Sequence, residues 1–100
     1  RPDGSMAEGL AAQIAQAFAN LETILAAHGL GMRDVLKLNY FLTSREDVAV
    51  LREVRARFLP DPPPASTTII AALMDERWLF EIDALAAVRD PGSAISTKAV

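Results

Sequence analysis

The stretch that decides the fold is Trp78-Leu79-Phe80-Glu81-Ile82-Asp83-Ala84-Leu85-Ala86-Ala87-Val88, a mostly apolar run of strand length that contains two carboxylates. Its side chains alternate between two sides, as in a β-strand, and neither side is plainly polar. A charge at Glu81 costs free energy if it is buried without a partner. A carboxylate in this run must therefore be paired, hydrogen-bonded or used, which makes Glu81 the first candidate for a functional residue.

The composition restricts what the chain can do. One hundred residues, of which 51% are hydrophobic, are enough for one small domain with its own core. The formal net charge of −3 argues against a nucleic acid or an anionic membrane as partner. The chain has no cysteine and one histidine, which excludes cysteine-based zinc sites and argues against a Ser-His-Asp triad. We expect no metal site, no cofactor, no membrane association and, by default, a cytoplasmic location.

Ahead of this strand, the pattern predicts a helix, a strand and a second helix. Residues 5–28 carry apolar side chains at helical spacing, and Gly29 suits the left-handed conformation that often ends a helix. Residues 34–42 alternate as a strand does, and residues 45–59 return to helical spacing, with Ser44 as N-cap. The side chains expected to be buried are Leu10, Ile14, Phe18, Leu21 and Leu25, then Leu36, Leu38, Tyr40 and Leu42, and finally Val48, Leu51, Val54 and Phe58.

The second half of the chain predicts two more strands. The proline-rich segment 60–64 cannot be helical, and strands are expected at 65–73 and 77–88. The three-residue link between these strands predicts an antiparallel hairpin. Residues 89–100 are expected to form a C-terminal loop, which leaves residues 1–88 as the single domain.

The order helix, strand, helix, strand, strand predicts an α+β fold with a mixed sheet. A strand–helix–strand passage of this length favours a parallel crossover. Each helix has one apolar stripe, so both are expected on the same side of the sheet. The strands are apolar on both sides, and such a sheet needs two covers. We therefore expect another copy of the chain to cover the second side, which predicts a homo-oligomer.

A set of residues recurs in a characteristic order from about residue 2 to residue 88. Its members are Gln13, Gln16, Asn20-Leu21, Leu25, Gly29, Asp34-Val35, Lys37, Leu42, Pro64-Ala65 and Glu81-Ile82-Asp83-Ala84-Leu85-Ala86. In this order and spacing the chain resembles the RidA/YjgF family, also called endoribonuclease L-PSP. The resemblance implies a chorismate-mutase-like fold and a homotrimer with sites in the clefts between subunits. Family members have a strand hairpin before the first helix that is not present in this sequence, so we expect further residues ahead of Arg1.

The resemblance also implies a chemistry. RidA-type enzymes hydrolyse reactive enamines and imines to ketoacids and ammonia. Their penultimate strand begins Pro-Ala-Arg, and the arginine binds the substrate carboxylate with a bidentate fork. Ser66 stands at that position here, and loss of a charge-assisted contact costs about 1.5–3 kcal/mol. Glu81 matches the family's glutamate that helps to position the attacking water, so the water end of the site is retained while its carboxylate end is lost.

The sequence leaves two interpretations open for several of these residues. Glu81 is either a catalytic, water-orienting carboxylate at a subunit cleft or a structural carboxylate at a subunit contact. Ser66, Thr67 and Thr68 either line a substrate-binding pocket or reflect the preference of threonine for strands. The arginines of the second helix lie among acidic residues, so an ordinary charged face is favoured over a phosphate-binding stripe.

Three functions follow from these alternatives. The first is a RidA-like homotrimer with a small-molecule site that hydrolyses an enamine or imine whose recognition needs no arginine clamp. The second is a ligand-binding trimer of the same fold without turnover. The third, an endoribonuclease-like activity, ranks low because the chain is acidic. Arg33, Arg57 and Arg77 could replace the missing arginine, but nothing in their positions along the sequence favours any of them. Each is expected to be a solvated surface charge.

Overall fold

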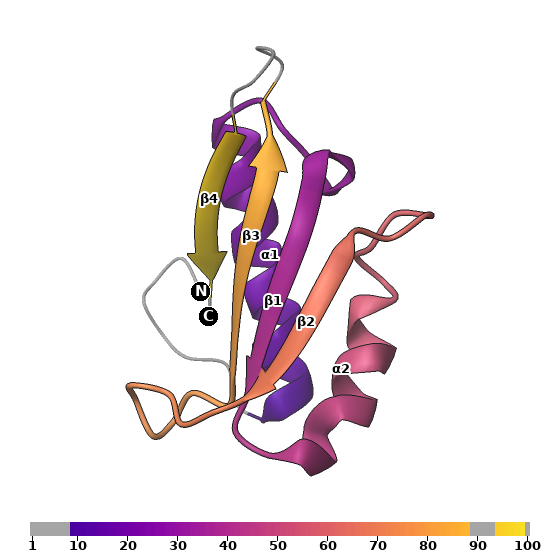
Figure 1. Ribbon diagram of the computed structural model, residues 1–100. Helices are drawn as coiled ribbons and strands as arrows, with labels where there is room; N and C mark the ends of the chain where they lie inside the picture. The colour runs from indigo at the N-terminus through magenta and orange to yellow at the C-terminus, as the bar shows by residue number, and fades with distance from the viewer. Residues whose placement is uncertain (1–8, 89–93, 100) are drawn as a thin grey trace.

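A four-stranded mixed sheet with two helices on one side forms the domain (Figure 1). The computed structural model describes residues 9–88 and the backbone of residues 94–99, together with the side chain of Thr97. The elements in chain order are α1 (Leu10–Ala27), the 3-10 turn η1 (Met32–Asp34), β1 (Val35–Leu42), the 3-10 turn η2 (Arg45–Asp47), α2 (Val48–Arg55), β2 (Ala65–Ile70), β3 (Phe80–Ala87) and β4 (Ala94–Ala99). The strand order is β2-β1-β3-β4, with β1 parallel to β2 and antiparallel to β3, and β3 antiparallel to β4. The predicted α+β fold and the parallel crossover from β1 through α2 to β2 are confirmed.

The first helix lies where the apolar spacing placed it. Four of its five predicted core residues are fully buried, and Leu10 packs against the core from the edge. Gly29 has a φ of 72° after the last turn, and the Leu30 N–H donates to the Leu25 carbonyl at 2.9 Å, which closes the helix end. The predicted start at residues 5–8 lies outside the described residues. None of the helices within the described ranges is long and apolar enough to cross a membrane.

The second helix is shorter than predicted. The segment expected to be helical at 45–59 begins with η2, continues as α2 and ends in turns after Arg55. Ser44 caps it as expected, because its Oγ accepts a hydrogen bond from the Glu46 N–H at 3.4 Å. Leu51 and Val54 are buried, while Val48 and Phe58 pack against the core from its margin.

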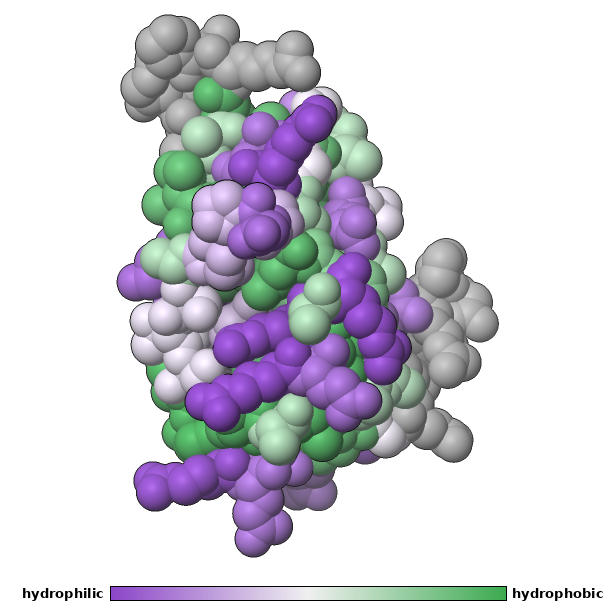
Figure 2. All heavy atoms as spheres, turned by 90° about the vertical axis from the view of Figure 1, so that its right-hand side faces the viewer, coloured by the Kyte–Doolittle hydropathy of each residue, from purple (hydrophilic) through white to green (hydrophobic). Residues whose placement is uncertain are grey.

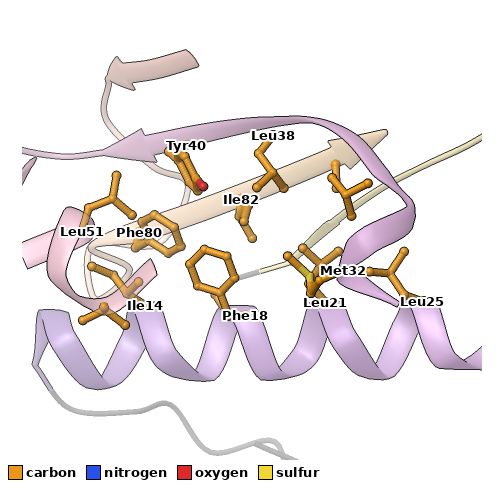
Figure 3. Packing of buried hydrophobic residues seen from close by; sticks show 14 of the residues in the cluster. Ile14, Phe18, Leu21, Leu25, Met32, Leu38, Tyr40, Leu51, Phe80 and Ile82 are labelled. Carbon is orange, nitrogen blue, oxygen red and sulfur yellow. The ribbon is translucent and has the colours of Figure 1, made fainter. Parts of the chain in front are cut away.

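Both helices pack on the same side of the sheet, as predicted, and the core fills the space between the two layers (Figure 3). Phe18 of α1 lies at its centre, with ring centroids 4.9 Å from Phe58, 6.2 Å from Tyr40 and 6.4 Å from Phe80. Burial of aromatic and aliphatic side chains of this size supplies most of the stabilisation of such a domain. The sheet contributes Leu38, Tyr40, Leu42, Phe80, Ile82, Ala84 and Ala86 to this layer.

One buried polar side chain connects the first helix to the entrance of β3. Gln13 of α1 is 9% exposed, and its Nε2 donates to the Arg77 carbonyl at 2.8 Å. Its Oε1 accepts from the Leu79 N–H at 2.7 Å. The amide therefore satisfies two backbone groups that precede β3 and fixes the point at which this strand enters the sheet.

The strand β1 contains an irregularity that the alternation rule did not anticipate. Val35 pairs with Ala86 and Lys37 pairs with Leu85, so one extra residue is accommodated between them. As a result Val35 is buried and Leu36 is 53% exposed. The prediction that Leu36 faces the core is therefore wrong, because a bulge shifts the residues before it to the other side of the sheet.

The last two predicted strands do not form a hairpin. β1 lies between β2 and β3, so this prediction is wrong. The strands are shorter than the apolar pattern suggested, and a nine-residue connection, residues 71–79, replaces the three-residue link. Such a connection is long enough to carry the chain across the end of β1, where the Ala71 N–H donates to the Leu42 carbonyl at 2.8 Å.

The C-terminal segment is not a loop throughout. Residues 94–99 form β4, which pairs with β3 from Ile82↔Ala99 to Ala87↔Ala94. The turn-forming sequence at 90–93 separates two strand-like runs, which is the usual sequence pattern of a hairpin. The predicted tail is corrected accordingly, since β3 gains a partner on its outer side.

Candidate functional site

The side of the sheet opposite the helices carries Glu81. Cross-strand register places three rows of residues there, each running from β3 through β1 to β2. The rows are Glu81, Phe41 and Ile69, then Asp83, Asn39 and Thr67, and then Leu85, Lys37 and Ala65. Ile69 and Leu85 are each 40% exposed, but charged and amide side chains stand between them. This side is therefore less uniformly apolar than the sequence suggested.

Glu81 is half-buried and has no polar partner among the side chains that the structure describes. It pairs in register with Phe41. Its carboxylate makes no hydrogen bond and no ion pair with any side chain that the structure describes, a set that leaves out most side chains of β4. Most buried or half-buried carboxylates have such partners. The Glu81 oxygens are therefore available to a ligand, a water molecule or another chain.

The neighbouring carboxylate is occupied. Asn39 Nδ2 donates a hydrogen bond to Asp83 Oδ1 at 2.8 Å, and both residues are half-buried. This bond joins β1 to β3 one row away from Glu81. Within residues 9–88 and 94–99, no three histidine, aspartate or glutamate side chains gather as metal ligands would. Of the two carboxylates on the helix-free side of the sheet, Glu81 is thus the one that can bind a water molecule or a ligand.

The three hydroxyl residues of β2 do not share one side of the sheet. Thr67 pairs with Asn39 and lies on the side of Glu81. Ser66 pairs with Leu38, and Thr68 pairs with Tyr40, so both lie on the side of the helices. All three are exposed because β2 is an edge strand. Strict alternation along a strand requires this division, although the three residues are neighbours in the sequence.

Within one chain, Glu81 and Ser66 are held apart. The strand β1 lies between β2 and β3, and neighbouring strands are about 4.8 Å apart, so β2 and β3 are separated by about 10 Å. The two side chains also leave the sheet on opposite sides. One protomer therefore does not bring Glu81, Ser66 and Thr68 together around one small ligand.

The structure identifies a residue that sequence reasoning did not single out. Arg55, in the last turn of α2, places its Cζ 5.5 Å from the centroid of the Tyr40 ring. Tyr40 is fully buried, and its hydroxyl has no hydrogen bond of good geometry to a described residue. Burial raises the pKa of Tyr40, and the nearby Arg55 guanidinium lowers it in part. The signal in the sequence is the position of Arg55 four residues after Leu51, on the flank of the buried stripe.

Arg77 does not replace the missing arginine. Its guanidinium forms two hydrogen bonds to Asp75, with Nη2 2.8 Å from Oδ2 and Nε 3.1 Å from Oδ1. Hydrogen bonds from Arg77 lower the pKa of Asp75 to about 2. The pair stabilises the exposed connection before β3 and leaves the Arg77 fork occupied. The expectation that Arg77 is a solvated surface charge holds in the sense that its side chain is 74% exposed.

Comparisons with known proteins agree on the kind of domain. Residues 2–88 match the family described as Endoribonuclease L-PSP. The chain is 35% identical to the mitochondrial protein mmf2 of Schizosaccharomyces pombe over 85% of its own length and 71% of that protein. It is 30% identical to a 2-iminobutanoate/2-iminopropanoate deaminase of Dermatophagoides farinae, over 73% of the chain but only 57% of the relative. The crystal structure of RidA from an Antarctic Psychrobacter superposes with a TM-score of 0.83 at 33% identity, covering 87% of this chain and 71% of that one.

Proposed function

The chain belongs to the endoribonuclease L-PSP family, which includes RidA and YjgF, and from this premise we propose that it is a small-molecule deaminase with sites between subunits. The proposed substrate is a reactive enamine or imine, and Glu81 orients the attacking water. The deaminase relative and the RidA structure support this class of reaction. A homotrimeric assembly and a cytoplasmic location are part of the proposal.

The reaction needs one well-placed carboxylate. An enamine first takes up a proton at carbon and loses one from nitrogen, which converts it to an imine. Water then adds to the imine carbon, with Glu81 holding the water and accepting one of its protons while the nitrogen is protonated. The carbon–nitrogen bond breaks, ammonia leaves and a carbonyl compound remains, so one imine and one water give one ketone and one ammonia. General acid–base assistance of this kind contributes about 10²–10⁴-fold to a rate.

The observation that carries the proposal is the uncommitted, half-buried Glu81 carboxylate on the helix-free side of the sheet. The sheet separates it from the hydroxyls of Ser66 and Thr68. In the proposed oligomer, a second protomer covers this side of the sheet and contributes the hydroxyl end of the site. A site that combines the Glu81 carboxylate with the hydroxyls of Ser66 and Thr68 then needs two chains, which is why the proposal includes an oligomer.

The test is a coupled assay in which 2-aminoacrylate is generated enzymatically and release of the ketoacid is measured. Glu81→Gln keeps the size of the side chain and removes its charge, so we expect kcat to fall by about 10²–10⁴-fold. Asp83→Asn is the matched control, because it removes a charge one row away on the same side. Equal activity of wild type and Glu81→Gln would overturn the catalytic role. Light scattering of the same samples reports the assembly, and a monodisperse monomer would contradict the intersubunit site.

A second function is favoured by one specific observation. Ser66 stands where the family's deaminases carry arginine, so a trimer that binds its ligand without turnover remains a candidate. Wild-type protein that binds a ketoacid but releases none from 2-aminoacrylate would establish this binding function instead.

A further inference from the structure

The helix-free side of the sheet carries opposite charges at its two ends. It faces the viewer in Figure 1, with α1 behind the sheet. At one end, Glu81 lies in a row with Phe41 and Ile69. At the other end, Lys37 lies in a row with Leu85. Phe41 is half-buried, and Ile69 and Leu85 are each 40% exposed. Each of the two charges therefore stands beside apolar surface that the chain itself leaves uncovered.

The two charges do not meet within one protomer. No ion pair or hydrogen bond joins Lys37 or Glu81 to a side chain that the structure describes. Glu81 pairs in register with Phe41, and Lys37 is four residues before Phe41 on β1. Four residues of a strand span about 13 Å, so Lys37 and Glu81 are held at a distance from each other. A contact between them is therefore possible only between copies of the chain.

A cover on this side of the sheet creates a need for a cation. The cover takes Glu81 out of water, and a buried carboxylate costs free energy unless a positive charge or hydrogen bonds accompany it. Among the described side chains of the three rows that run from β3 through β1 to β2, Lys37 is the one cation. The carboxylate between the two ends, Asp83, already accepts a hydrogen bond from Asn39. The charges left to be matched are thus Glu81 and Lys37.

The neighbouring flank of the molecule lacks this polarity. Figure 2 looks onto the flank formed by α2 and β2 and shows hydrophilic side chains beside small hydrophobic areas. Basic and acidic residues follow one another closely along α2, as in Arg52-Glu53. The helix-free side instead keeps its cation apart from Glu81, and this separation gives it a direction. A second copy of the same surface is complementary to it when the unlike ends meet.

We propose that Lys37 of a second copy of the chain binds the Glu81 carboxylate, with the Glu81 end of one protomer against the Lys37 end of the next. Leu85 beside the lysine then packs against Phe41 and Ile69 beside the glutamate. In a closed ring every Glu81 meets the Lys37 of a neighbour, so no Glu81 is left unpaired.

The ion pair also has a role at the proposed active site. A carboxylate has two oxygens, so one can accept a hydrogen bond from the lysine ammonium while the other holds the attacking water. Lys37 is then a positioning residue for Glu81. This role rests on the proposed function, whereas the contact itself concerns assembly and is measured without substrate.

Sedimentation of the full chain at a series of protein concentrations tests the contact. Lys37→Gln leaves a covered carboxylate without its cation, so the concentration at which half of the oligomer dissociates should rise by at least about 30-fold. Lys37→Arg keeps the charge and should assemble nearly as well as wild type. Arg33→Gln is the matched control, because Arg33 is exposed in η1 and its replacement changes the net charge equally. Circular dichroism confirms that the variants fold.

A charge exchange separates the ion pair from a general effect of charge. Lys37→Glu sets two carboxylates against each other and should weaken the oligomer at least as much as Lys37→Gln. In Lys37→Glu/Glu81→Lys the unlike charges meet again, and the assembly should recover most of the loss. Lys37→Glu that assembles as tightly as wild type, a double variant no tighter than Lys37→Glu, or a monomeric wild type would overturn the proposal.

One other lysine gives a competing outcome. Lys98 occupies the register position opposite Asp83 on β4. If Lys98→Gln loosens the oligomer and Lys37→Gln does not, the assignment of Lys37 is wrong.

The result is independent of the deaminase assay. Recovery of the oligomer by the charge exchange, with no turnover by wild type, supports the contact and rejects the proposed enzyme. Turnover that requires Glu81, in an oligomer that Lys37→Glu leaves intact, rejects the contact and leaves the enzyme in place.

Discussion

Replacing Gln13 by alanine tests how the entrance of β3 is held. The side chain makes two hydrogen bonds to the backbone, to the Arg77 carbonyl at 2.8 Å and from the Leu79 N–H at 2.7 Å. Each such bond contributes about 0.5–1.5 kcal/mol net, so their loss should lower the free energy of unfolding by about 1–3 kcal/mol. Because both backbone groups would be left near the core without partners, the upper half of this range is expected.

Urea unfolding followed by circular dichroism measures this change, with all samples at one protein concentration because an oligomer makes stability depend on it. Gln16→Ala is the matched control. Gln16 lies on the same helix, and its Nε2 bonds only locally, to Asn20 Oδ1 at 2.9 Å, so its replacement should cost no more than about 0.5 kcal/mol. A loss below about 0.5 kcal/mol for Gln13→Ala would show that the two bonds do not hold this segment.

Three further predictions follow from burial, backbone conformation and charge. Leu38→Ala removes a fully buried side chain and should cost about 2–5 kcal/mol, whereas Leu36→Ala, at the bulge, should cost less than about 0.5 kcal/mol; equal losses in urea titrations would contradict the assigned bulge. Gly29→Ala puts a Cβ on a residue with a φ of 72° and should lower the unfolding free energy by about 1 kcal/mol, and no change in thermal unfolding would argue against this helix end. The Asp75 carboxyl should titrate in NMR with a pKa of about 2, so the stability from its contact with Arg77 is present above the unfolded pKa and lost as the pH falls towards 2. In Arg77→Gln the pKa should return towards 3.8, and an unaltered titration would refute the assigned cause.

Local patterns predicted the single elements well, because burial on one side imposes a period on the sequence. The stripe of α1 and the alternation of β3 correspond to the buried residues of the structure. The order of strands was harder to predict. Nothing local distinguishes a hairpin between β2 and β3 from an arrangement in which β1 lies between them, since both satisfy the same apolar pattern. The choice depends on the connection of residues 71–79, which looked like the continuation of two strands.

The candidate site was only partly accessible from the sequence. Glu81 was identifiable because a charge in an apolar strand is conspicuous, and the structure places it on the helix-free side. The division of Ser66 and Thr68 from Thr67 follows from alternation alone. Arg55 was hidden among other charged residues of its helix, because its contact with Tyr40 depends on how α2 docks on β1. Docking angles between layers leave no periodic trace in a sequence, so contacts of this kind are found only in three dimensions.

The central position of β1 also has a consequence for synthesis on the ribosome. β1 and its parallel neighbour β2 emerge first, but the other backbone edge of β1 waits for β3, which begins 38 residues after Leu42. At about 5–20 residues per second, this edge stays open for roughly 2–8 s in every nascent chain. For the last part of this interval, the ten residues from Ile70 to Phe80 or about 0.5–2 s, the half-made sheet offers unpaired N–H and C=O groups beside the exposed isoleucines of β2. A chaperone that shields this edge should raise the yield of folded protein.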